Sequence, residues 1–187
     1  MWNLPNILTL MRIALIPVFI AVYYTSWEWH NLLAAAIFGL AAATDWVDGY
    51  VARKYNQVTP FGAFLDPVAD KLIVVAAMVM LLEQYSTPWF ALPAVVIIGR
   101  DIIISALREW MAERGYSGTV AVAMIGKVKT WVQMSAIALL LAARPEDQLF
   151  TQLGYVAIYF AAGLTLWSMV HYLRAAWPQL SATDNKS

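Results

Sequence analysis

The stretch that decides the fold runs from Thr44 to Lys71 and reads TDWVDGYVARKYNQVTPFGAFLDPVADK. It holds four aspartates and three cations. The apolar run LLAAAIFGLAAA precedes it, and LIVVAAMVMLL follows it. Because charged groups inside a membrane are costly, such residues are functional by default. What these charges bind is therefore the first question that the sequence raises.

The overall composition indicates a membrane protein. Of the 187 residues, 61% are hydrophobic and 13% are charged, whereas a soluble domain carries about 25% charged residues. Twelve Lys and Arg balance twelve Asp and Glu, so no charge excess argues for nucleic acid as a partner. The absence of cysteine excludes disulfides and thiolate metal sites. The N-terminal stretch lacks a basic region and a cleavage site, so we expect a retained helix rather than a signal peptide.

Six segments are long and apolar enough to span a bilayer, which takes about 20 mostly apolar residues per helix. They are residues 6–25, 31–53, 62–84, 88–108, 119–143 and 149–173. Because lipid cannot satisfy exposed backbone groups, we predict that each segment is a helix and that the fold is an all-α bundle of transmembrane helices. A single membrane domain would cover residues 1–173, followed by a polar C-terminal tail over 174–187.

The distribution of cations predicts the orientation of the bundle. Six spans place both termini on one side, and only Arg144 lies on the opposite side. The cations on the shared side are Arg12, Arg53, Lys54, Lys71, Arg100, Arg108, Arg114, Lys127, Lys129, Arg174 and Lys186. The positive-inside rule makes that side cytoplasmic. Trp27, Trp29 and Trp89 fall at the other helix ends, where interfacial aromatic residues are common.

The four aspartates of the opening stretch are expected to meet at the cytoplasmic ends of two helices. Asp45 and Asp48 lie on one face of the second predicted helix, and Asp66 and Asp70 lie on one face of the third. Small residues beside these acids allow the two helices to approach closely. The connection between the helices is short, so we expect them to be antiparallel neighbours with converging carboxylates.

Converging carboxylates in a low-dielectric setting repel one another and require a counter-charge. Arg53, Lys71 and a bound metal ion are the available cations. Oxygen ligands without His or Cys select hard ions, namely Mg²⁺, Mn²⁺ or Ca²⁺. Two divalent ions would balance four carboxylates, and two-metal carboxylate sites commonly serve displacement at phosphorus. An ion path in a transporter is the alternative, although the cluster lies at a membrane face and the chain shows no obvious inverted repeat.

The spacing Asp45-x2-Asp48-Gly49-x2-Ala52-Arg53-x8-Gly62-x3-Asp66-x3-Asp70 resembles, without gap or substitution, the signature of the CDP-alcohol phosphotransferase family. The stretches NLPNILTLMRIALIPVF, GRDIIISALREWMAERG and GKVKT are similar to bacterial members that use sn-glycerol 3-phosphate as acceptor. The resemblance implies a six-helix homodimer in the bacterial cytoplasmic (inner) membrane. It implies transfer of a phosphatidyl group from CDP-diacylglycerol to glycerol 3-phosphate, with Mg²⁺ or Mn²⁺ as cofactor, two ions being expected.

The resemblance also implies roles for individual residues. The metal ligands would be Asp45, Asp48, Asp66 and Asp70, with Asp70 also acting as general base. The residues that bind CDP-diacylglycerol would be Asn6, Thr9, Gly49, Arg53 and Thr59. For Arg53, an anchoring role at the membrane surface is the simpler alternative, and for Asn6 and Thr9 it is capping of the first helix.

The phosphate of the acceptor is expected to meet a group of cations on the fourth and fifth helices. Arg100 and Arg108 lie about 80° apart around one helix, so both can face one pocket. Lys127 and Lys129 lie about 200° apart, so only one of them points there, and the resemblance favours Lys127. The simpler alternative is that all four cations anchor helix ends at the membrane surface.

Two other functions remain open at this stage. The first is an enzyme of the same family with another acceptor, such as serine, inositol phosphate or a phospholipid. The second is a metal-coupled or proton-coupled transporter, in which the aspartates would line an ion path.

Overall fold

The computed structural model describes residues 4–54, 59–114, 124–144 and 146–181, and within the helices it leaves the side chains at 4–5, 46–54, 63, 124–127 and 179 undescribed. In these residues the chain forms six α-helices, which confirms the predicted all-α class. They are α1 (Leu4–Tyr23), α2 (His30–Lys54), α3 (Pro60–Tyr85), α4 (Pro88–Glu113), α5 (Met124–Ala142) and α6 (Gln148–Ser181).

A threonine followed by a proline fixes the start of two helices. At α3, the side chain of Thr59 accepts a hydrogen bond from the N–H of Gly62, and at α4 Thr87 does the same for Phe90. Such caps satisfy backbone donors that have no partner within the helix. Proline suits the position that follows, since its fixed φ is helical and its missing N–H is not needed there.

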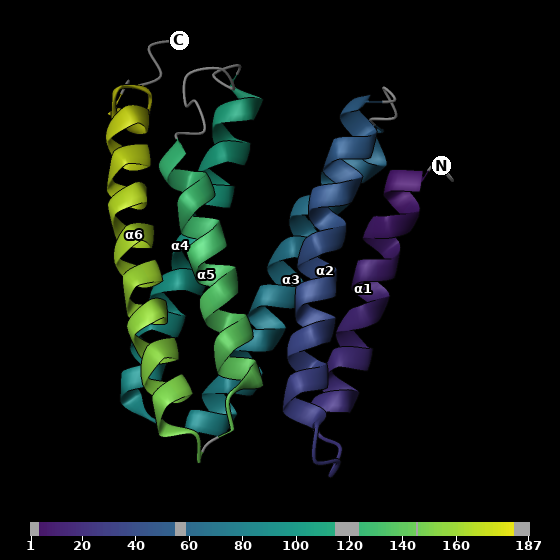
Figure 1. The fold of residues 1–187 in the computed structure, drawn as a ribbon. Coiled ribbons are helices and arrows are strands. Elements are labelled where there is room, and N and C mark those ends of the chain that lie inside the picture. Colours follow the sequence, from purple (N-terminus) through teal and green to yellow (C-terminus); the bar gives the residue numbers. More distant parts are fainter. Residues whose placement is uncertain (1–3, 55–58, 115–123, 145, 182–187) are drawn as a thin grey trace.

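The helices form two groups of three, with α1 to α3 in one group and α4 to α6 in the other (Figure 1). In the first group α1 packs against both α2 and α3, and in the second α6 packs against both α4 and α5. Contacts of α2 with α5 and of α3 with α4 and α5 join the groups. The first helix therefore lies along both helices that carry the aspartates.

Burial separates the inside of the bundle from its outside in the way expected of a membrane protein. Phe19, Phe38 and Leu81 are at most 1% exposed and belong to the apolar core. Large apolar side chains also cover the outer surface, where Val95 and Val156 are each 69% exposed. An outer surface of this kind suits lipid rather than water as its surroundings.

Three helices contain stretches long and apolar enough to cross a membrane: Asn6–Tyr23, Pro88–Glu113 and Gln148–Pro178. Val128–Ala142 in α5 is apolar but shorter. These are the stretches of this kind within the residues that the structure describes. The protein is thus a helical protein with several membrane-crossing stretches, and the count of six spans remains a prediction.

The arrangement of the helix ends agrees with the predicted alternation of the chain. The starts of α1, α3 and α5 and the ends of α2, α4 and α6 all lie at one end of the bundle, at the top of Figure 1. This is the end that the cation distribution predicts to be cytoplasmic. We refer to it below as the charged end.

The last helix is longer than the span predicted for it. α6 continues to Ser181, whereas the predicted span and domain end at residue 173. Ala176, beyond the predicted end, is 0% exposed, so α6 still packs against the bundle there. The rest of the predicted polar tail, residues 182–187, lies outside the described residues.

Candidate active site

One side of α1 carries three buried polar side chains near the charged end. Asn6, Thr9 and Arg12 are 2%, 0% and 0% exposed. They follow one another at intervals of three residues, slightly less than one helical turn. Buried polar groups of this kind require partners, and a buried guanidinium requires them most.

Each of these side chains has a partner at or near the start of α3. Thr59 donates a hydrogen bond from Oγ1 to Asn6 Oδ1 at 3.0 Å. Thr9 donates from Oγ1 to Asp66 Oδ1 at 2.5 Å. Because α1 and α3 start at the same end and run in the same direction, these contacts follow each other along both helices. These two contacts join α1 to Thr59, which caps α3, and to Asp66 within α3.

The third contact joins three helices at once. Arg12 Nη1 lies 2.5 Å from Asp70 Oδ1 on α3 and 3.2 Å from Asp45 Oδ1 on α2. Because both oxygens contact the same nitrogen, the carboxylates of Asp45 and Asp70 lie close to each other. The side chain of Arg12 is fully buried, whereas those of Asp45 and Asp70 are 44% and 39% exposed. The carboxylates thus have an open side, and the guanidinium lies on their inner side.

Gly62 allows α1 and α3 to approach at this point. A Cβ atom added at Gly62 would lie 2.6 Å from Asn6 Oδ1 and 3.2 Å from Thr59 Oγ1. Both distances are shorter than ordinary van der Waals contact, so any larger residue would displace one of these side chains. The glycine of the aspartate signature is therefore a packing requirement of the contact between Asn6 and Thr59.

The donor chemistry of the aspartates fits a hard divalent cation. Asp45, Asp66 and Asp70 offer carboxylate oxygens, and the chain has no cysteine that could add a thiolate. The side chains of Asp48, Gly49 and Arg53 lie outside the described residues. Among the side chains that are described, no three His, Cys, Asp or Glu residues are close enough together to hold an ion. The four-carboxylate metal site therefore stays a prediction.

The second group of predicted site residues gathers between α4, α5 and α6. The guanidinium carbon of Arg100 lies 5.8 Å from the centroid of the Tyr172 ring, and that of Arg108 lies 5.1 Å from it. Arg108 also donates a hydrogen bond to the Tyr172 hydroxyl at 2.7 Å. The structure thus brings together the two arginines that the helical spacing assigns to one face.

Lys129 joins these arginines, which the sequence reasoning did not favour. It is only 4% exposed, and its Nζ lies 2.9 Å from Asp101 Oδ1. Arg100 Nη1 lies 3.0 Å from the same oxygen, and its Nη2 donates to Ser168 Oγ at 3.0 Å. The side chain of Lys127, the favoured candidate, lies outside the described residues.

Comparison with known proteins identifies the family. Residues 2–167 match the family model described as CDP-alcohol phosphatidyltransferase. The chain belongs to the CDP-alcohol phosphatidyltransferase family. The match covers most of the chain and includes both the aspartates and the basic cluster formed by Arg100, Arg108 and Lys129, so both groups belong to the region shared by this family.

Several relatives of this CDP-alcohol phosphatidyltransferase carry the name CDP-diacylglycerol–glycerol-3-phosphate 3-phosphatidyltransferase. One from Pseudomonas fluorescens is 50% identical, over 98% of this chain and 95% of its own. One from Escherichia coli K12 is 54% identical, over 94% of this chain and 95% of its own. One from Salmonella typhimurium LT2 has the same identity and coverage as the Escherichia coli relative.

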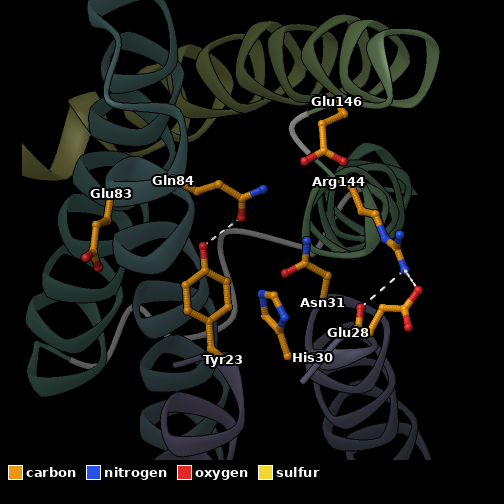
Figure 2. A pocket seen from close by; sticks show the side chains of 8 residues that line it. All are labelled: Tyr23, Glu28, His30, Asn31, Glu83, Gln84, Arg144 and Glu146. Atoms are coloured by element: carbon orange, nitrogen blue, oxygen red, sulfur yellow. Dashed lines mark hydrogen bonds and ion pairs between the residues drawn. The ribbon is translucent and has the colours of Figure 1, made fainter. Parts of the chain in front are cut away.

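A cavity of about 500 Å³ lies at the other end of the bundle (Figure 2). Its lining includes Glu28 and Arg144, which form an ion pair at 3.7 Å. It also includes Tyr23, which donates a hydrogen bond to Gln84 at 2.7 Å. These residues come from the helix ends opposite the aspartates. The cavity is therefore separate from the candidate active site of the phosphatidyltransferase.

The cation distribution places Arg12 on the charged side but does not predict its contacts with the aspartates. The signal that points to it is a charged residue six positions after Asn6 and three after Thr9 in an apolar helix. A polar stripe of this kind indicates a face that binds other polar groups rather than lipid.

We predict that the hydroxyl of Thr9 stabilises the site through Asp66. Replacing Thr9 with Val keeps the shape of the side chain and removes its hydrogen bond to a charged group, which contributes about 1.5–3 kcal/mol. Thr165 is the matched control, because it is also fully buried and its hydroxyl has no hydrogen-bond partner among the described residues. In unfolding titrations in detergent, Thr9→Val is expected to lower the free energy of unfolding and Thr165→Val to leave it nearly unchanged or raise it. Equal losses in the two variants would contradict the role given to Thr9.

Proposed function

We propose that this chain transfers the phosphatidyl group of CDP-diacylglycerol to sn-glycerol 3-phosphate, giving phosphatidylglycerol phosphate and CMP. The observation that carries the proposal is the 50–54% identity to relatives named for this reaction, over nearly their whole length. The proposal places the enzyme in the bacterial cytoplasmic membrane as a homodimer with both termini in the cytoplasm. The excess of cations at the charged end supports this orientation.

The reaction is a displacement at the phosphorus atom that carries the diacylglycerol. The oxygen of the acceptor 1-hydroxyl forms a bond to this phosphorus, and the bond from the phosphorus to the CMP oxygen breaks. The electron pair of that bond leaves with CMP. Asp70 would take the hydroxyl proton, for which it must come within hydrogen-bond distance of the acceptor. Its partly exposed carboxylate supports this role, since a fully enclosed one could not meet a substrate.

The remaining aspartates would hold divalent cations together with Asp70. We assign Asp45, Asp48 and Asp66 as ligands and expect two ions, Mg²⁺ or Mn²⁺. An ion held by these carboxylates would supply Lewis-acid stabilisation of the negative charge that develops on the departing CMP. The contact that links Asp45 and Asp70 through Arg12 supports the assignment, because it brings carboxylates of α2 and α3 to one point.

The same end of α1 and α3 would bind the nucleotide. Asn6, Thr9 and Thr59 lie beside the aspartates, and Gly49 and Arg53 are assigned to the same ligand through the family signature. A glycine permits close approach of a ligand to the helix backbone, and an arginine can bind a phosphate through two parallel hydrogen bonds.

The basic cluster of α4 to α6 supports a phosphorylated acceptor. Among its described side chains, Arg100 and Lys129 share the carboxylate of Asp101, whereas Arg108 donates to the Tyr172 hydroxyl. The Nε of Arg100 is buried and has no hydrogen-bond partner among the described residues. A phosphomonoester would supply both the missing negative charge and an acceptor for this donor. Serine has no net charge and an uncharged alcohol has no anionic group, so neither adds net negative charge to the cluster, which favours a phosphorylated acceptor such as glycerol 3-phosphate.

The first test of the function is the reaction itself. Purified protein in detergent, given CDP-diacylglycerol and radiolabelled glycerol 3-phosphate, is expected to form labelled lipid and CMP in equal amounts. EDTA should abolish the reaction and Mg²⁺ or Mn²⁺ should restore it. Asp70→Asn should remove turnover while the helical circular dichroism spectrum is retained. Product formation from serine or inositol phosphate instead would exclude the proposed acceptor, and full activity in chelator would exclude the metal.

The second test concerns the acceptor phosphate. Replacing Arg100, Arg108 or Lys127 with Ala should raise the KM for glycerol 3-phosphate much more than the KM for CDP-diacylglycerol. Loss of one charge-assisted contact of about 2–3 kcal/mol corresponds to a loss of about thirtyfold to more than a hundredfold in kcat/KM. Parallel Lys127→Met and Lys129→Met variants show which lysine meets the phosphate.

The control for these variants is Arg114→Ala. Arg114 directly follows α4 at the same end of the bundle, and its guanidinium carbon lies 4.6 Å from the centroid of the Trp110 ring. Its removal should leave the KM for glycerol 3-phosphate nearly unchanged. If the cluster variants also keep near-normal glycerol 3-phosphate kinetics, the acceptor binds elsewhere.

A further inference from the structure

Arg12 has no role in the proposed reaction, yet it is among the largest fully buried side chains of the protein. Burial of a guanidinium is costly, because the group loses its contact with water, and carboxylates must compensate for that loss. Here one nitrogen contacts carboxylates of two helices, Asp45 on α2 and Asp70 on α3. These are two of the proposed metal ligands.

Arg12 and a metal ion bound by the aspartates would contact the same carboxylates from opposite sides. Arg12 contacts both carboxylates from the buried side, while each aspartate side chain keeps roughly two fifths of its surface exposed. A cation arriving from outside the bundle and the guanidinium inside it therefore share the same two carboxylates. A fixed positive charge next to a carboxylate stabilises its ionised form and repels a second cation.

We propose that Arg12 is an internal counter-ion that weakens the binding of divalent cations by the aspartates while holding the carboxylates of α2 and α3 together. This inference rests on the proposed metal site. Its consequence is that the protein alone holds its ions weakly, and that the diphosphate of the substrate supplies the ligands and the negative charge needed for firm binding. Mg²⁺ sites in proteins commonly combine one or two carboxylates with phosphate groups of the substrate.

The alternative is that Arg12 only positions the aspartates for the metal. The two roles predict opposite changes in affinity when the charge is removed. A counter-ion weakens binding of the metal, so its loss strengthens that binding. A residue that only preorganises the ligands favours binding, so its loss weakens it. Arg12→Met removes the charge and keeps an unbranched side chain, whereas Arg12→Lys keeps the charge and loses the planar guanidinium.

The test is a Mn²⁺ titration of the full-length protein in detergent without substrate, in which electron paramagnetic resonance reports the free ion. Arg12→Met is expected to bind Mn²⁺ about tenfold more tightly than the wild type, a coupling of ordinary size between two sites. Arg12→Lys is expected to stay close to the wild type. An affinity in Arg12→Met that equals or falls below that of the wild type would overturn the proposal.

Two further measurements complete the test. Asp66→Asn should weaken Mn²⁺ binding, and if it does not, the proposed metal site fails independently of Arg12. If Arg12→Met is too unstable for the titration, its thermal unfolding in EDTA and in Mn²⁺ is compared with that of the wild type. In EDTA this variant should melt below the wild type, and Mn²⁺ should raise its Tm by more than it raises that of the wild type. A variant that is equally destabilised with and without Mn²⁺ contradicts the counter-ion role.

Discussion

Repulsion between carboxylates at one end of an apolar bundle is the constraint on which the rest of this structure depends. Asp45 comes from α2, and Asp66 and Asp70 come from α3, so the two helices can meet there only if their charges are compensated. The first helix provides part of that compensation through the hydroxyl of Thr9 and the guanidinium of Arg12. Its packing against both α2 and α3 follows from this. The glycine at position 62 leaves room for the neighbouring contact between Asn6 and Thr59. A helix that reads from its sequence as a simple membrane span is therefore part of the candidate site.

The two halves of the bundle carry complementary chemistry. The group α1 to α3 holds the aspartates, which suit metal ions and a nucleotide diphosphate. The group α4 to α6 holds Arg100, Arg108 and Lys129, which suit a phosphate on the acceptor. In the proposed function an electrophile and a nucleophile, both anionic, must approach one another. Separate counter-charges for each reduce the repulsion that would otherwise oppose the reaction.

Features that depend on the helical repeat alone could be predicted from the sequence. The six helices, the shared face of Asp66 and Asp70, and the common position of Arg100 and Arg108 all follow from the helical repeat and the distribution of apolar residues. The contacts of Arg12 could not be predicted, because they join residues 33 and 58 positions apart and depend on how α1 packs. The choice between Lys127 and Lys129 also depends on tertiary contacts, since Asp101 holds Lys129 inside the basic cluster. α6 continues beyond its predicted end at residue 173, and Ala176 packs against the bundle there, a tertiary contact that hydropathy alone does not reveal.

The proposed binding of divalent cations where α1, α2 and α3 meet at the charged end can be tested directly. The most direct measurement is the anomalous diffraction of crystals soaked in Mn²⁺. The account predicts anomalous density within coordination distance, about 2.0–2.6 Å for hard cations, of the carboxylate oxygens of Asp45, Asp66 and Asp70. Density confined to the opposite end of the bundle, beside the glutamates of the cavity in Figure 2, would contradict it.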